Sequence, residues 1–176
     1  MAVATKSPKS HLRKPLTAER LRELLHYDPE TGAWTWVKPR NRINPGDRAG
    51  WYNFYGYLRI RIDGWKYVAS RLAFLYVLGR WPEAEIDHKD GNRLNNRWDN
   101  LREASHNENM WNMKRRRDNA SGFKGVTWDK HRRKWTAHIK IDGRHIRLGL
   151  FRTPEAAHEA YKAKAIELFG EFARLE

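Results

Sequence analysis

The apolar residues recur with helical spacing in three segments, residues 16–26, 70–78 and 153–169, and each segment is predicted to form a helix. Thr17 precedes the first apolar face and is suited to accept a bond from a free backbone N–H of the first turn. Gly79 follows the second segment and Gly170 follows the third, and glycine at this position commonly ends a helix.

Shorter segments alternate apolar and polar residues, which is typical of strands. Residues 33–37 follow turn-forming residues at 28–32, and residues 123–128, 135–141 and 145–151 form a later group of three predicted strands. An Asp-Gly pair at 142–143 separates the last two strands and favours a tight hairpin turn between them.

The alternation around Asp63-Gly64 predicts a second hairpin. Leu58, Ile60 and Ile62 fall on one face of its first strand, and Arg59 and Arg61 fall on the other. Two interpretations of the basic face stay open: it lies along DNA, or it is simply the solvated outer face of a sheet.

Composition narrows the class of protein. The chain has 176 residues, a net charge of +14 and no cysteine, which excludes a disulfide framework, a thiol nucleophile and a cysteine-bound zinc. The first 15 residues are polar and basic, without the apolar core of a signal peptide, and no apolar stretch approaches the length of a membrane span. We expect a cytoplasmic protein, in a host cell if it is phage-encoded, with no membrane partner.

The distribution of charge favours a polyanion as the partner. Two basic flanks enclose a central segment, residues 81–118, in which acidic and basic residues balance. Cationic arms around carboxylates suit a metal site that acts on bound nucleic acid, because the arms hold phosphate while carboxylates hold the cation. Chance clustering of solvated charges is the alternative.

The candidate chemistry lies at residues 86–109. Asp87 and His88 end a short apolar approach, a loop rich in Gly and Asn follows, Asn100 comes twelve residues after the histidine, and Asn109 comes nine residues later. A lone Asp-His pair is more often a surface turn, but the joint spacing reverses that interpretation. These positions resemble the signature of HNH endonucleases, in the His-Asn-Asn version of phage and intron-encoded homing nucleases.

The residues suggest their own roles. Phosphodiester hydrolysis needs a cation on the phosphate oxygens and a base that deprotonates water. Asp87 and Asn109 can give oxygen ligands to one Mg²⁺ (or Mn²⁺), and His88 has the pKa of a general base at neutral pH. The resemblance implies that Asn100 tethers the loop and orients the histidine segment. Nearby alternatives fall off the spacing and are ranked lower: Asp90, Asn96 and His106. Metal affinity without DNA is expected to be weak.

Residues 121–176 resemble an Apetala-two/ERF DNA-binding domain. The match includes Phe123-Lys124-Gly125-Val126, Leu148-Gly149 and the Thr153-x-Glu155-Ala156-Ala157 helix start. In that family the sheet enters the major groove, which implies DNA contacts from Lys124, Trp128, Lys130, Arg132, Lys140 and Arg147. His138 and Arg147 depart from the plant pattern, so no sequence preference follows. Trp135, Phe151 and Tyr161 are assigned to the core.

The expected fold is α+β. A basic tail, residues 1–15, precedes an HNH domain over 16–112, in which hairpins and helices lead into a ββα-metal (His-Me finger) centre at about 84–112. A basic linker follows at 113–120, with Lys114, Arg115 and Arg116 as further DNA contacts. A three-stranded antiparallel sheet packed on one helix completes the chain at 121–176.

The expected function is metal-dependent hydrolysis of double-stranded DNA by a homing-type nickase. One site in each chain favours a nick, with a monomer on DNA and no obligate protein partner, leaving 5′-phosphate and 3′-hydroxyl ends. Two alternatives stay open. One is a DNA-binding regulator with an inactive nuclease centre, and the other is an RNA-binding protein.

Overall fold

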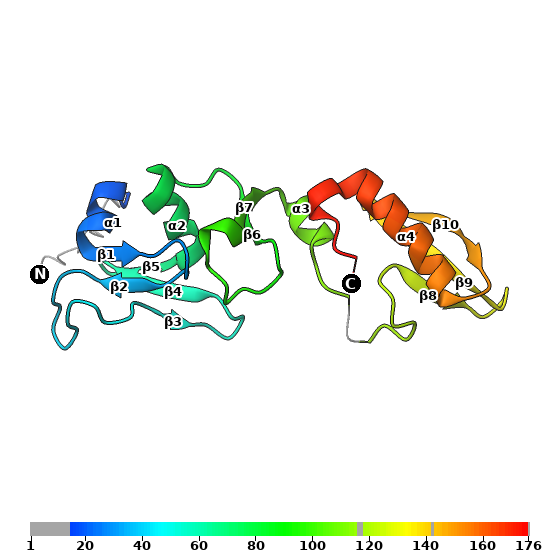
Figure 1. Ribbon diagram of the computed structural model, residues 1–176, viewed down its shortest axis with the longest axis horizontal. Coiled ribbons are helices and arrows are strands. Elements are labelled where there is room, and N and C mark those ends of the chain that lie inside the picture. Colours follow the sequence, from blue (N-terminus) through cyan, green and yellow to red (C-terminus); the bar gives the residue numbers. More distant parts are fainter. Residues whose placement is uncertain (1–14, 116–117, 142, 176) are drawn as a thin grey trace, which may run out of the picture.

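The computed structural model describes residues 15–115, 118–141 and 143–175. It is a mixed α and β structure of small antiparallel sheets and short helices, arranged as two units at the ends of an elongated molecule (Figure 1). We call residues 15–112 the N-terminal unit and residues 121–175 the C-terminal unit. Each unit has its own apolar core. None of the described helices is long and apolar enough to cross a membrane.

The N-terminal unit begins with a short helix and a series of hairpins. Its elements are α1 (Ala18–Leu24), β1 (Leu25–Tyr27), β2 (Trp34–Trp36), β3 (Trp51–Tyr52), β4 (Leu58–Ile62), β5 (Trp65–Val68) and α2 (Ala69–Leu78). Strands β1 and β2 form one sheet, and β3, β4 and β5 form another. The predicted cap is confirmed, since the Thr17 side chain accepts from the Arg20 backbone N–H. Gly79 ends α2 in the left-handed conformation, as predicted.

The predicted hairpin at Asp63-Gly64 is also confirmed. Both turn residues have positive φ, 47° and 86°, which matches the twist of a two-residue hairpin turn. The apolar residues of β4 are buried against α1 and α2, whereas Arg59 and Arg61 face outward. The β3–β4–β5 sheet therefore has one apolar inner face and one basic outer face.

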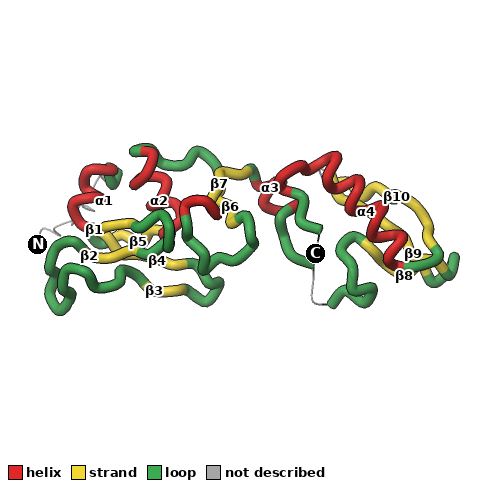
Figure 2. The backbone as a smooth tube through the Cα atoms, viewed as in Figure 1, coloured by secondary structure: helices red, strands yellow, loops and turns green. Residues whose placement is uncertain are grey.

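A second hairpin and a helix connect the two units. The elements are β6 (Glu85–His88), a 3-10 turn (Trp98–Asn100), β7 (Leu101–Ala104) and α3 (His106–Trp111), and β6 pairs with β7. Ser105 caps α3 in a reciprocal arrangement with Glu108, which fixes the start of the helix. Figure 2 shows the long loop between β6 and β7 folded back beside the hairpin.

The C-terminal unit is a three-stranded antiparallel sheet packed on one helix, as predicted. Its elements are β8 (Val126–Asp129), β9 (Lys134–Ile141), β10 (Arg144–Phe151), α4 (Pro154–Phe169) and a final 3-10 turn, η2 (Gly170–Phe172). Tyr161 is a buried residue of α4, and Trp135 and Phe151 pack against the core, as the sequence indicates.

Candidate active site

Asp87 and His88 are the last two residues of β6, and they line the floor of a cleft of about 800 Å³. Both side chains are buried, with 7% and 4% of their surface exposed. The Lys89 N–H donates to the Asn100 carbonyl and the Gly91 N–H donates to the His88 carbonyl, so the chain turns sharply after the strand.

The His88 ring is held between the β6–β7 loop, which contains Asn96, and Tyr57, which precedes β4. Its Nε2 lies 3.5 Å from the Oδ1 of Asn96, and its ring centroid lies 6.3 Å from that of Tyr57. Burial lowers the pKa of His88, although the Asn96 contact opposes this shift. A neutral imidazole at pH 7 can accept a proton, which a general base requires.

The Asn96 segment is fixed from behind by the N-terminal turn. The Tyr27 hydroxyl donates to the Asn96 carbonyl at 2.6 Å, and the Trp98 N–H donates to the Pro29 carbonyl at 2.9 Å. Gly32 approaches so closely that an added Cβ would lie 2.4 Å from the Asn96 carbonyl carbon. The turn at residues 28–32 therefore supports the residue that contacts His88.

Asn100 makes the hydrogen bonds of a loop tether. Its Oδ1 accepts from the Asp90 N–H at 3.0 Å, and its Nδ2 donates to the Asp90 carboxylate at 3.0 Å and to the Asn95 carbonyl at 2.8 Å. The side chain is 8% exposed and does not line the cleft. These bonds connect Asn100 to both ends of the segment 90–95, and the orienting role of Asn100 remains a prediction.

Asp87 is paired with two side chains that the sequence analysis missed. Arg102, its neighbour across the β6–β7 ladder, places Nε at 2.9 Å and Nη2 at 2.8 Å from the Asp87 carboxylate. Asn112, at the end of α3, donates its Nδ2 to both carboxylate oxygens and to the His88 carbonyl, each at 2.9 Å. All three side chains are buried or nearly so.

Asn109 lines the same cleft but is not bonded to Asp87. Its Nδ2 donates to the Glu85 carboxylate at 2.6 Å, near the rim where His106 also contacts Glu85 at 3.2 Å. The structure thus places Asn112 nearer to Asp87 than the residue that spacing selects. Asn112 follows Asn109 by three residues on a helix, so the shared face was a signal for it.

Comparison with known proteins identifies the family. A family model described as HNH endonuclease matches residues 67–111. Protein 3.8 of Escherichia phage T7 is 42% identical over 89 residues, which cover 51% of this chain and 73% of that protein. The chain therefore contains an HNH endonuclease domain. An uncharacterized HNH endonuclease, L560 of Acanthamoeba polyphaga mimivirus, is 34% identical over 104 residues, 57% of this chain and 53% of that protein. No solved structure matches the chain.

HNH nucleases act with a divalent cation, and the residues of the cleft can be tested for one. The described residues contain no group of three or more His, Cys, Asp or Glu side chains placed to hold a metal. A single carboxylate and amide oxygens still suit Mg²⁺, which keeps several waters and takes phosphate oxygens as ligands. Asp87 fits this donor set, with Asn109 or a rotated Asn112 amide beside it. A cation there must compete with the Arg102 guanidinium for the carboxylate.

The basic outer face of the β3–β4–β5 sheet extends to the edge of the cleft. Arg61 pairs with Lys66 and Arg59 with Val68 across the β4–β5 ladder, and directly paired residues share a face. Val68 and Tyr57 then line the cleft beside His88. The sequence-predicted pair Arg59 and Arg61 therefore lies on a surface that is continuous with the cleft beside His88.

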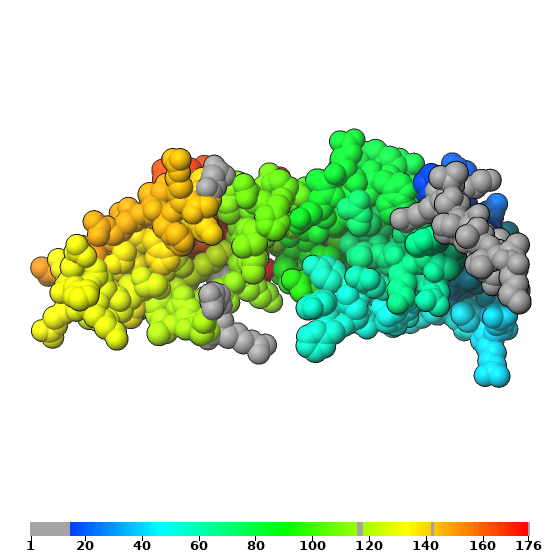
Figure 3. All heavy atoms as spheres, turned by 180° about the vertical axis from the view of Figure 1, so that it is seen from behind, coloured from blue at the N-terminus to red at the C-terminus, as the bar shows by residue number. Residues whose placement is uncertain are grey.

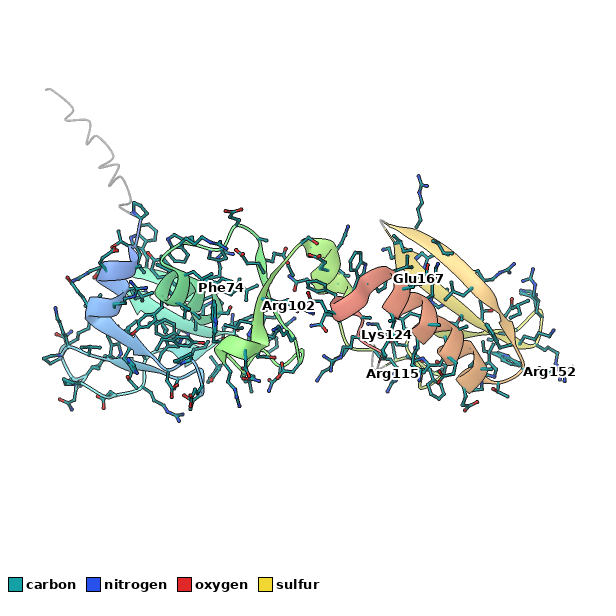
Figure 4. The ribbon with its side chains drawn as sticks, turned by 45° about the horizontal axis from the view of Figure 1, so that its top comes forward. Phe74, Arg102, Arg115, Lys124, Arg152 and Glu167 are labelled. Atoms are coloured by element: carbon teal, nitrogen blue, oxygen red, sulfur yellow. The ribbon has the colours of Figure 1, made fainter. Side chains whose placement is uncertain are left out.

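The linker cations lie where the units meet. Lys114 lines the catalytic cleft, and Arg115 is exposed and lines a neighbouring cavity. Figure 4 shows Arg102, Arg115 and Lys124 along this junction, apart from Phe74 in the N-terminal core and Arg152 at the far end of the molecule. Arg116, the third linker residue of the prediction, lies outside the described residues.

Lys124 differs from its expected position. Its Nζ donates to the Trp111 carbonyl at 2.8 Å and to the Met113 carbonyl at 2.7 Å, at the C-terminal end of α3. Burial lowers its pKa to about 8. The residue joins the two units, because its Nζ reaches from the loop before β8 to the C-terminal end of α3.

The other predicted DNA contacts divide between two faces. Lys140 pairs with His145 and Arg147 with His138 across the β9–β10 ladder, on the face opposite the buried Ala137 and Ile139. Trp128 lies two residues after Val126 in β8, so both side chains lie on the sheet face that packs against α4. The Trp128 side chain is nevertheless 45% exposed and packs edge-on against Trp135. Lys130 and Arg132 are exposed in the turn after β8, with Arg132 paired to Asp129.

Proposed function

We propose that the protein is a metal-dependent DNA endonuclease of the homing type that nicks one strand of a duplex, with His88 as general base. The observation that carries the proposal is the buried His88 ring beside Asp87 on the floor of a cleft that is reached by a basic sheet face. One such centre in each chain supports a single-strand cut by a monomer.

In this mechanism the protein groups orient a phosphate and a water. His88 accepts the water proton, because burial keeps its pKa low, and the contact with Asn96 holds the ring in place. Asn100 fixes the loop through Asp90 and Asn95, so the histidine stays on the floor of the cleft. The products are a 5′-phosphate and a 3′-hydroxyl end.

Asp87 and Asn109 are the proposed holders of the cation, with Asn112 as a further candidate. A bound Mg²⁺ or Mn²⁺ would stabilise negative charge on the phosphate and the leaving oxygen. Before binding, Arg102 and Asn112 satisfy the Asp87 carboxylate. This arrangement supports weak metal affinity without DNA, since the substrate phosphate is needed to complete the ligand set.

Double-stranded DNA is the proposed substrate. Arg59 and Arg61 would hold phosphates along the first sheet, and Lys114 lies at the cleft itself. The C-terminal unit is proposed as an Apetala-two/ERF-like module, with Lys140 and Arg147 on the face that would meet the groove.

A plasmid-nicking assay tests the nuclease proposal. Supercoiled plasmid is incubated with Mg²⁺, with Mn²⁺ or with EDTA, and His88→Ala is compared with His131→Ala, an exposed histidine outside the cleft. We expect nicked circles only with metal, a loss of nicking of at least a hundredfold in His88→Ala, and normal activity in His131→Ala. Equal nicking by both variants would refute the role of His88.

A DNA-binding regulator with an inactive centre is the second candidate. The specific observation is that Arg102 and Asn112 already satisfy both oxygens of Asp87. This candidate predicts a gel shift of duplex DNA by wild type and by His88→Ala, with no cutting under any metal condition. A metal-dependent nick by wild type excludes it.

A further inference from the structure

The turn between β3 and β4 exposes an aromatic side chain beside the cleft. Phe54 is 97% exposed, the highest value among the large apolar residues of the described chain, and the adjacent Tyr55 is 68% exposed. The two rings meet edge-on with centroids 5.6 Å apart. A phenylalanine so exposed adds nothing to the core, so its presence at a loop tip suggests a ligand.

The backbone beneath Phe54 is held rigidly. The Asn53 Oδ1 accepts from the N–H groups of Tyr55 and Tyr57, at 3.0 and 2.9 Å. The Asn53 N–H donates to the Tyr57 carbonyl and the Gly56 N–H donates to the Asn53 carbonyl, both at 2.9 Å, with Gly56 at a φ of 82°. The ring is thus presented on a preformed turn, which lowers the entropic cost of inserting it into a ligand.

This turn is tied directly to the catalytic loop. The Arg93 guanidinium donates to the Tyr55 carbonyl at 3.2 Å and lies 4.8 Å from the Tyr57 ring centroid. Tyr57 in turn faces His88 at 6.3 Å. Three residues span roughly 10 Å at most, so Phe54 lies within a few base-pair steps of a phosphate held at His88. In Figure 3 the cyan surface around residues 50–60 borders the notch between the two units.

The surroundings of the turn carry the charge that DNA requires. Trp51 pairs with Arg59 on the outer face of the sheet, and Arg61 and Lys66 extend that face away from the cleft. Cations that hold phosphates beside an apolar tip are the combination used by side chains that wedge between base pairs. An apolar protein partner would bury these positive charges without supplying negative charges to pair with them, which disfavours such a partner.

We propose that Phe54 is a wedge that inserts between two adjacent base pairs of double-stranded DNA, next to the phosphate positioned at His88. Tyr55 and Trp51 flank it, and Arg59 and Arg93 hold the backbone on either side. Insertion would unstack and bend the duplex at the cleavage site, opening the strand toward the cleft. This inference rests on the proposed function, in that the ligand is the substrate of the same site.

A topological assay tests the wedge without knowledge of the target sequence. Relaxed circular plasmid is incubated with protein in EDTA, so that no cutting occurs. A type IB topoisomerase, which needs no metal, then relaxes the torsional strain in the protein-bound plasmid. The linking number is then read on a gel after the protein is removed. Phe54→Ala, Phe54→Leu and the control Ile166→Ala, an exposed apolar residue on α4, are compared at equal bound fractions.

We expect wild type and Ile166→Ala to lower the linking number, Phe54→Leu to retain part of the effect, and Phe54→Ala to lose it. The Phe54→Ala protein should bind DNA roughly tenfold more weakly, with unchanged thermal stability because the ring packs on no core residue. Equal unwinding by wild type and Phe54→Ala would overturn the proposal, as would wild type that binds without unwinding or does not bind duplex DNA. Loss of self-association in Phe54→Ala with unwinding intact would instead assign the ring to contacts between copies.

The parallel nicking assay separates the two proposals. Metal-dependent nicking without unwinding leaves the nuclease and removes the wedge. Unwinding that depends on Phe54, with no nicking under any metal condition, leaves the wedge and removes the nuclease.

Discussion

Gly32 offers a sharp test of how the N-terminal turn supports the catalytic loop. Its φ is 73°, and an added Cβ would lie 2.4 Å from the carbonyl carbon of Asn96 and 2.6 Å from the backbone nitrogen of Arg97. Gly79 provides a matched control, because its φ is 71° and no described atom lies within 4 Å of an added Cβ. The two Gly→Ala substitutions share the backbone strain and differ in the collision.

The magnitudes follow from these contacts. An alanine in the left-handed region costs about 1–2 kcal/mol, and the change in unfolded-chain entropy is the same at both positions and cancels. Forcing a methyl group into a packed backbone adds about 1–3 kcal/mol. We therefore expect Gly32→Ala to lower the free energy of unfolding by about 1–3 kcal/mol more than Gly79→Ala does.

Urea unfolding followed by tryptophan fluorescence measures both values. A plasmid-nicking assay on the folded proteins adds a second measurement, because displacement of Asn96 moves the group that contacts His88. Gly32→Ala should nick more slowly than Gly79→Ala. Equal destabilisation in the two variants, within about 0.5 kcal/mol, would refute the argument that close packing on Asn96 supports the loop.

Three further predictions concern the cleft and its junction with the C-terminal unit. Burial lowers the pKa of His88, and a general base acts when it is neutral. The initial nicking rate should therefore rise with pH through a midpoint below about 6.5 and then level off. A midpoint above that value would contradict the role of His88 as general base. If Asn109 holds the cation, Asn109→Ala should raise the Mg²⁺ concentration for half-maximal nicking. Asn112→Ala should instead lower the free energy of unfolding by about 1–3 kcal/mol, because the buried Asp87 carboxylate loses a hydrogen-bond donor. If the Mg²⁺ dependence of nicking changes in Asn112→Ala and not in Asn109→Ala, Asn112 is the ligand. Lys124→Met should lower the free energy of unfolding by about 1–3 kcal/mol, because two carbonyls lose their donor, and the exposed Lys130→Met should have little effect in the same urea experiment.

Local features of the fold could be predicted from the sequence because local chemistry determines them. The Thr17 cap, the Asp63-Gly64 turn and the Gly79 helix end each depend on residues within four positions of one another. The inward and outward faces of β4 follow from the alternation of side chains in a strand. These rules need no knowledge of which segments meet in space.

The contacts around Asp87 could not be predicted in the same way. The spacing identifies Asp87 and His88, but Arg102 reaches Asp87 only through the register of β6 with β7. Asn112 depends on where α3 docks against that hairpin. Lys124 was assigned to DNA because its position on the chain matches a family pattern, whereas its direction depends on packing between the units.

The contacts of Arg102 link the proposed cation site to the C-terminal end of the described chain. Its side chain is 10% exposed, contacts Asp87 at 2.8 Å, donates to the Glu171 carbonyl at 2.9 Å and lies 3.7 Å from the Phe172 ring centroid. The Glu171 carboxylate, at 3.2 Å, is a second anionic partner for the same guanidinium. A cation that binds Asp87 must displace part of this charge, and Glu171 can then hold the arginine.

Glu171→Gln should therefore make the cation site harder to fill. Arg102 would remain more tightly on Asp87, and the Mg²⁺ concentration for half-maximal nicking should rise about two- to fivefold, because an ion pair with one exposed partner contributes up to about 1 kcal/mol. Glu167→Gln is the control, since it removes an exposed carboxylate of α4 that pairs only with Lys164 among its described ion pairs. An unchanged Mg²⁺ dependence in Glu171→Gln would show that Arg102 does not compete for Asp87, and that the C-terminal turn supports the fold without influencing the cation.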